Sequence, residues 1–149
     1  MPVKQAVGVD AAEMAGSGYR HSAAGFESVS AMSIAGGRDK ANFFDSAGND
    51  LLSSNSTGTT LSGQGFDNSA SGFRTVKVTA EGGGFNSAIF EALSAEDQIQ
   101  GRSNWAAATR AGRVVTAIDF DAVQYSTEPG EAPRADISAV DYLFEREGE

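Results

Sequence analysis

Two stretches of the chain decide its fold: GSGYRHSAAGF at residues 16–26 and GQGFDNSASGF at residues 63–73. They lie 47 residues apart and are identical at six of eleven positions. The same offset carries Phe26 to Phe73 and then to Phe120. A repeat with one fixed offset predicts a fold in which similar units stack on one another.

The repeat organises the whole chain, residues 1–149, as a single repeat domain. Residues 1–15 read as the tail of an earlier copy, 16–62 as the first copy, 63–109 as the second and 110–149 as a degenerate terminal copy. An opening half-repeat without a signal peptide predicts that the chain is the C-terminal piece of a longer protein.

Each copy contains a strand with alternating side chains. In residues 74–79, Val76 and Val78 face one way, while the threonines and Lys77 face the other, which is the period of a half-buried strand. The equivalent inward pairs are Val29/Ala31 and Val123/Tyr125, and the outward column is Ser30, Lys77 and Gln124. Gly-Gly pairs follow at 36–37 and 83–84, where tight turns need positive φ.

Further strands are predicted at 41–44, 51–52, 59–61, 88–90 and 98–99, which gives four or five strands per copy. The predicted fold is all-β: a repeat-built β-solenoid with a capping C-terminal segment, with a β-sandwich or barrel as the alternative. Residues 88–97 and 137–146 are rich in Ala, Leu and Glu, so each is also a candidate short helix. Residues 128–133 replace the Gly-Gly turn in the third copy and predict an insertion there.

Composition excludes several classes of function. The formal charge of −9 argues against nucleic acid as a partner, and no apolar run is long enough for membrane insertion. With no cysteine and one histidine, the chain cannot build thiol catalysis or a multi-histidine metal site. The only histidine, His21, has Asn68 as its equivalent, which favours a structural hydrogen bond over catalysis. Residues 119–149 hold nine acids and two basic residues, which indicates a solvated acidic end.

The first copy reads GFESVSA at 25–31 and AGGRDKANFFDSAGNDLL at 35–52. This pattern resembles the glycine- and aspartate-rich β-repeats near the C-termini of large secreted or surface proteins of planctomycete-type bacteria. The resemblance covers most of the chain and implies an exported, non-catalytic repeat region, extracellular or on the cell surface. The second copy departs from the pattern, because Asn86 replaces Asp39 and Ala92 replaces Asp45.

Two sets of residues are candidates for ligand binding. Phe44, Phe85 and Trp105 do not recur at the repeat offset, so they are candidates for stacking on sugar rings, whereas the recurring rings are predicted to form core ladders. Those recurring rings are Phe26, Phe43, Phe66, Phe73, Phe90 and Phe120. Asp39 and Asp50 follow turn glycines, as in half of a calcium β-roll motif, and carboxylate oxygens suit calcium. Asp45 is the third candidate ligand.

The sequence predicts no catalytic residue and therefore no enzyme. The expected function is a non-catalytic structural or adhesive module, with neighbouring repeats of the parent protein or extracellular polysaccharide as partners. The alternatives are a carbohydrate-binding module, a calcium-stabilised β-roll, and a polysaccharide-active enzyme on a β-helix.

Overall fold

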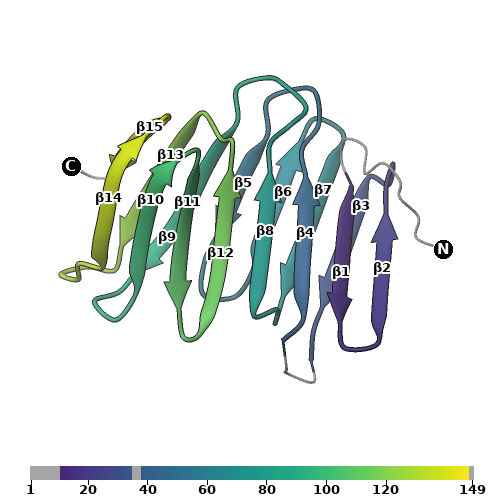
Figure 1. Cartoon of the computed structure of the whole chain (residues 1–149), viewed down its shortest axis with the longest axis horizontal. Coiled ribbons are helices and arrows are strands. Elements are labelled where there is room, and N and C mark those ends of the chain that lie inside the picture. The colour runs from purple at the N-terminus through teal and green to yellow at the C-terminus, as the bar shows by residue number, and fades with distance from the viewer. Residues whose placement is uncertain (1–10, 35–37, 148–149) are drawn as a thin grey trace.

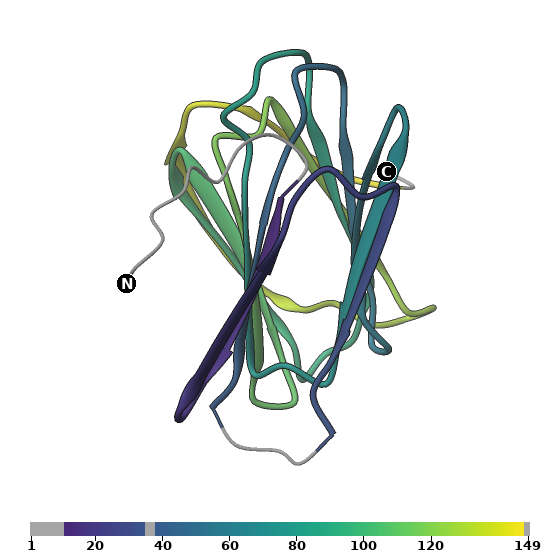
Figure 2. The same cartoon turned by 90° about the vertical axis from the view of Figure 1, so that its right-hand side faces the viewer.

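The computed structural model describes residues 11–34 and 38–147, which form fifteen β-strands and no helix (Figure 1). The described residues therefore contain no helix that could cross a membrane. The strands form two sheets that face each other as layers (Figure 2). Both sheets are open, so the chain is a two-sheet β-solenoid, as predicted, and not a barrel.

The eight-stranded sheet has the order β14-β10-β11-β12-β8-β4-β1-β2. Its strands are β14 (Arg134–Val140), β10 (Gln98–Ser103), β11 (Trp105–Arg110), β12 (Arg113–Ile118), β8 (Thr75–Thr79), β4 (Lys40–Phe44), β1 (Ala12–Gly16) and β2 (Tyr19–Ala23). The seven-stranded sheet has the order β15-β13-β9-β5-β6-β7-β3. Its strands are β15 (Leu143–Arg146), β13 (Ala122–Thr127), β9 (Ser87–Leu93), β5 (Leu51–Ser54), β6 (Thr59–Gly63), β7 (Phe66–Ser71) and β3 (Ser28–Met32).

The strands fall into three units of five: β1–β5, β6–β10 and β11–β15. Equivalent strands keep the 47-residue offset, since β2, β7 and β12 begin at residues 19, 66 and 113. The fourth strands, β4, β9 and β14, likewise begin at residues 40, 87 and 134. The insertion predicted in the third copy is therefore wrong: the turn at 128–133 replaces the Gly-Gly turn without lengthening the unit.

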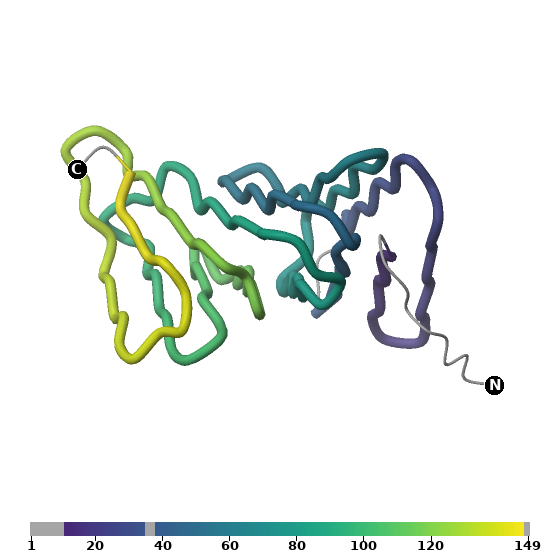
Figure 3. Tube along the Cα trace, turned by 90° about the horizontal axis from the view of Figure 1, so that it is seen from above, coloured from purple at the N-terminus to yellow at the C-terminus, as the bar shows by residue number. Residues whose placement is uncertain are grey.

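Successive units exchange the two sheets. The first, second and fourth strands of the first unit lie in the eight-stranded sheet, and the same strands of the second unit lie in the seven-stranded sheet. The third unit returns to the arrangement of the first. The reason is that the chain crosses between the sheets three times in each unit, and an odd number of crossings leaves the next unit on the opposite side. Figure 3 shows the resulting coils side by side along the long axis.

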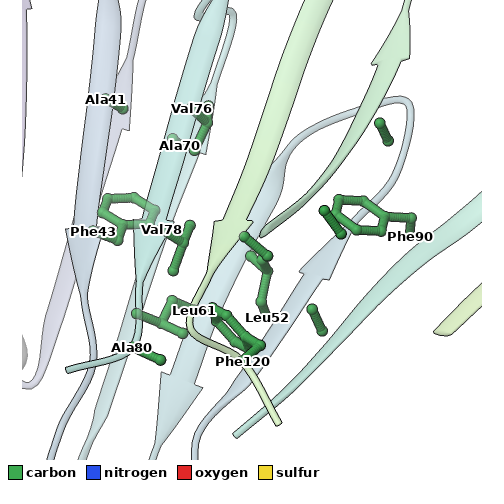
Figure 4. Close-up of a cluster of buried hydrophobic side chains, with 14 of the residues drawn as sticks. Ala41, Phe43, Leu52, Leu61, Ala70, Val76, Val78, Ala80, Phe90 and Phe120 are labelled. Atoms are coloured by element: carbon green, nitrogen blue, oxygen red, sulfur yellow. The ribbon is translucent and has the colours of Figure 1, made fainter. Parts of the chain in front are cut away.

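The interior is filled by the predicted inward columns. Val76, Val78 and Val123 are buried and Lys77 is exposed, as the alternation indicated. Five of the six recurring phenylalanines are buried, and Phe43, Phe90 and Phe120 lie in the cluster of Figure 4. The prediction is wrong for Phe26, which is 58% exposed, because no other unit of the described residues lies against its side of the first unit.

The two candidate helices are strands. Residues 88–97 contain most of β9 and residues 137–146 contain the end of β14 and all of β15. β9 pairs in parallel with β5 on one side and β13 on the other. Hydrogen-bond ladders on both sides of the strand outweigh the small helix preference of Ala, Leu and Glu. The predicted C-terminal cap is β15, which pairs in parallel with β13 and covers the end of the seven-stranded sheet.

Close contact between units requires glycine at several positions, and Gly72 is one of them. Gly72 has a φ of +79°, and a Cβ there would overlap the carbonyl oxygen of Ser33 in the preceding unit. At this contact the Ser33 N–H donates to the carbonyl of Ser71 (3.0 Å). Gly65 has a similar φ of +87° with no atom near its Cβ position, so it needs glycine for conformation alone.

We predict that Gly65→Ala lowers the free energy of unfolding by about 1–2 kcal/mol, the cost of a left-handed alanine. Gly72→Ala should cost about 1–3 kcal/mol more, because the methyl group also pushes two units apart. Urea unfolding of both variants measures the difference. Equal losses would show that the contact between Gly72 and Ser33 does not constrain the stack.

Candidate functional site

The turn after β4 is built around the carboxylate of Asp50. Asp50 accepts hydrogen bonds from the Ser46 N–H (2.6 Å) and from the Ser46 hydroxyl (2.7 Å to Oδ1). Short polar side chains commonly close turns in this way, by bonding backbone groups a few residues away. The carboxylate therefore fixes the path by which the chain leaves the eight-stranded sheet.

Asp45 joins the first unit to the second. It is 1% exposed, and its Oδ1 accepts the backbone N–H groups of Glu81 and Gly82 (2.7 Å each). Its Oδ2 accepts from the Asn86 amide nitrogen (3.1 Å), and the Asn86 amide oxygen accepts from the Asp50 N–H (2.9 Å). This network holds the loop before β9 against the turn after β4. It was not predictable from the sequence, because the partners lie about forty residues apart.

The three candidate calcium ligands lie in two separate places, and each accepts hydrogen bonds from protein donors. All four carboxylate oxygens of Asp45 and Asp50 accept hydrogen bonds from protein donors. Asp39 lies in a different contact, where its carboxylate accepts from the Ser33 hydroxyl (2.7 Å). The described residues hold no group of three acidic or histidine side chains that could bind a metal ion. These aspartates close turns and join units.

Burial raises the pKa of Asp45, and the negative charge of Asp50 raises it further. The backbone N–H groups of Gly82 and Glu81 act in the opposite direction, but the pKa remains above the ordinary value. The buried carboxyl group is therefore easier to protonate in the folded protein than in the unfolded chain.

Two of the three candidate sugar-binding rings lie in one row across the eight-stranded sheet. Residue pairing runs from Phe44 to Thr79, from Thr79 to Ile118 and from Ile118 to Trp105. The neighbours Phe43, Val78 and Ala117 face the core, so by strand alternation this row faces outward. We call these four residues the outer row; Thr79 and Ile118 were missed because their strands looked purely structural.

Phe85 lies apart from the outer row. It is 52% exposed in the loop before β9, and its backbone N–H donates to the side chain of Asn49 (2.7 Å). The neighbouring polar row on the outer face runs through Asn42, Lys77, Thr116, Ala107 and Gln100. The outer row thus forms an apolar strip beside hydroxyl, amide and ammonium groups.

A cavity of about 280 Å³ opens between the sheets where the second and third units meet. Arg110 and Arg113 line this cavity and are paired across the β11–β12 hairpin. The equivalent pair in the second unit is Gly63 and Phe66. Arg110 donates to a backbone carbonyl of β9 (2.7 Å), and its Nε lies 4.0 Å from the carboxylate of Asp97. The guanidinium group of Arg110 is therefore paired with groups of the protein itself.

His21 does not make the structural hydrogen bond expected of its column. Its ring packs against Tyr19, with ring centroids 5.5 Å apart. The equivalent Asn68 is completely buried, and neither polar atom of its side chain has a hydrogen-bond partner. The backbone of Asn68 takes part in the ladder between β6 and β7, while its side-chain amide lies in the interior.

The raised pKa of Asp45 predicts a specific pH dependence of stability. The linked stabilisation is complete below the unfolded-state pKa and is lost as pH rises through the folded-state pKa. Relative to Asp45→Asn, which keeps an acceptor for Glu81 and Gly82, the wild type should lose stability as the pH rises above the ordinary aspartate pKa of about 4. Urea unfolding over this range tests the prediction, with the exposed Asp67→Asn as control. A constant difference between wild type and Asp45→Asn would contradict it.

The chain was compared with known proteins. No family model, no curated protein and no solved structure matches it. Its function is therefore inferred from its own geometry.

Proposed function

We propose that the chain is a non-catalytic structural or adhesive module of an exported bacterial protein, located outside the cell or on its surface. In this role it extends, displays or attaches the protein that carries it. The observation that supports the proposal most directly is the use of the polar groups: the most buried carboxylates, Asp45 and Asp50, are consumed by turns and by contacts between units. The most buried acids of the described residues thus serve the stack itself.

Neighbouring repeats of the parent protein suit this role as partners. The units join through parallel ladders, such as β4 with β8 and β8 with β12. The same contact can in principle be repeated along a longer stack, because each unit carries the same strands in the same order.

The proposal predicts that the purified chain, incubated for a long time with a broad polysaccharide panel, releases neither reducing ends nor unsaturated uronates.

The chain should also resist proteolysis within its strands, because the ladders leave little of the interior backbone open to a protease. Released product would overturn the non-catalytic assignment, and rapid cleavage inside the stack would contradict a structural role.

Carbohydrate binding is the second candidate function, and the outer row favours it. Phe44, Ile118 and Trp105 are partly exposed although the core does not need them. Adjacent strands lie about 4.8 Å apart, close to the length of one sugar residue in an extended chain. A polysaccharide lying across the strands would meet apolar groups along the outer row and hydrogen-bonding groups along the row beside it.

We predict that Trp105→Ala and Phe44→Ala each weaken retardation in gels containing the bound polysaccharide by roughly tenfold, because aromatic contacts dominate such surfaces. Ile89→Ala is the matched control, since Ile89 faces outward on the seven-stranded sheet. Equal loss in the control, or unchanged mobility across the whole panel, would contradict the outer row as a glycan site.

A further inference from the structure

The third unit packs its interior differently from the second. Leu61 and Phe66 are 0% and 5% exposed in the second unit, and their equivalents in the third unit are Ala108 and Arg113. The third unit therefore has a methyl group and an exposed guanidinium group where the second has a leucine and a phenylalanine side chain. The cavity of about 280 Å³ is lined by both of these residues.

The residue at position 110 helps to keep this space open. In the second unit the ring of Phe66 lies over Gly63, because a Cβ at Gly63 would overlap the ring. The equivalent of Gly63 is Arg110, which carries a Cβ, so the side chain of residue 113 cannot lie over it in the same way. The β11–β12 hairpin that holds both arginines lies at the lower side of Figure 1. Large-to-small replacements in a core leave cavities, and here two such replacements meet at one place.

The two guanidinium groups that line the cavity use few of their donors. The Arg110 side chain is 14% exposed and donates one hydrogen bond, to the carbonyl of Glu91 (2.7 Å). Its Nε lies 4.0 Å from the carboxylate of Asp97, which is beyond hydrogen-bond distance. Arg113 is exposed, and no described residue pairs with its side chain. Because each guanidinium group has several N–H donors, the cavity offers donors that the protein does not use.

Most of the inner lining is apolar. Phe73 and Val76 are buried and Val115 is half-buried, and all three line the cavity. The buried hydroxyl groups of Ser54 and Thr59 also line it, but they are hydrogen-bonded to each other (3.2 Å). Small-molecule sites typically combine apolar walls with a few polar groups in this way. An apolar cavity of about 150 Å³ can hold benzene, so this larger cavity has room for a ring with a short side chain.

Two carboxylates line the same cavity. Asp97 accepts from the Ser94 N–H (2.8 Å) and lies beside Arg110, so its charge is already engaged. Glu128 is exposed on the turn after β13, and no described residue pairs with its side chain. Glu128 is therefore the group that opposes a bound anion, whereas the two arginines favour one. A guanidinium group suits a carboxylate in particular, because its planar donors match both carboxylate oxygens.

We propose that this cavity binds a small monocarboxylate with a compact apolar body, such as an aromatic acid. The apolar body lies against Phe73, Val76 and Val115, and the carboxylate accepts hydrogen bonds from Arg110 and Arg113. Both arginines serve one carboxylate because cross-strand partners project from the same face of a sheet. The site goes beyond the proposed function and is separate from the outer row, which faces outward.

The test is isothermal titration calorimetry of the full chain with benzoate, 3-phenylpropionate and 4-methylpentanoate. We expect a dissociation constant of about 1 mM or below for at least one of these acids. The matching neutral amide should bind at least about tenfold more weakly, because it lacks the charge that the arginines recognise. No binding of any of the three acids at about 10 mM, or equal binding of acid and amide, would overturn the proposal.

Three charge variants locate the site. Arg113→Gln should weaken binding of the acid at least about fivefold, because it removes a charge-assisted hydrogen bond. Glu128→Gln should strengthen binding about twofold or more, because it removes a like charge beside the carboxylate. Lys77→Gln is the matched control: it removes a positive charge from the outer face of β8 and should leave binding unchanged. An equal loss in Arg113→Gln and Lys77→Gln would overturn the site.

Ala108→Leu restores the residue that the second unit has at this position and should abolish binding by filling the cavity. Circular dichroism and melting temperature establish that each variant is folded. If Ala108→Leu does not fold, Arg113→Gln and Glu128→Gln carry the test, because both residues are exposed. Unchanged binding in a folded Ala108→Leu would show that the acid binds elsewhere and would overturn the proposal.

Discussion

The structure depends on the parallel hydrogen-bond ladders that join one unit to the next. Six of the parallel pairings link strands of different units: β3 with β7, β4 with β8, β5 with β9, β8 with β12, β9 with β13, and β10 with β14. Within a unit the pairing is mostly a hairpin, such as β6 with β7. A single unit therefore has few partners for its third and fourth strands, and its apolar columns stay open until another unit covers them.

This dependence explains how both ends close. Inside the stack, the fifth strand of one unit forms a hairpin with the first strand of the next unit. It lies between that first strand and the fourth strand of the same next unit, as in the orders β6-β5-β9 and β11-β10-β14. At the N-terminal end no such strand intervenes, and β1 pairs directly with β4 in antiparallel fashion. This is possible because β6 and β9 also run in opposite directions on either side of β5. At the C-terminal end β13 pairs directly with β15 in parallel. Each end of the described stack thus joins strands whose directions already suit the pairing.

The sequence was sufficient for the local structure and insufficient for the long-range structure. The fixed offset and the alternation around Val76 and Val78 predicted the stacked strands and their inward faces, because both signals are local. The exchange of sheets was not predictable, since it depends on how many times each unit crosses between the sheets. Phe26 was misassigned because a core column is buried only where a neighbour exists. The contacts of Asp45 were also not predictable, because its donors belong to residues 81, 82 and 86, which the local spacing of acids does not reveal.

The exchange of sheets also separates residues required by the fold from residues that are free to vary. The repeat equivalents of Phe44, Ile118 and Trp105 are Glu91, Ser71 and Gly58, which lie on or beside the seven-stranded sheet. The two sheets therefore present different outer surfaces although they are built from the same strand types. The first and third units place the same strand types in the eight-stranded sheet. Substitutions in both units therefore change the outer face of that sheet. If the chain crossed between the sheets an even number of times in each unit, each strand type would lie in one sheet only. With three crossings per unit, the inward-facing core residues recur in both sheets, whereas the outward-facing residues of one sheet can differ from those of the other. The outer row is an example of such a difference.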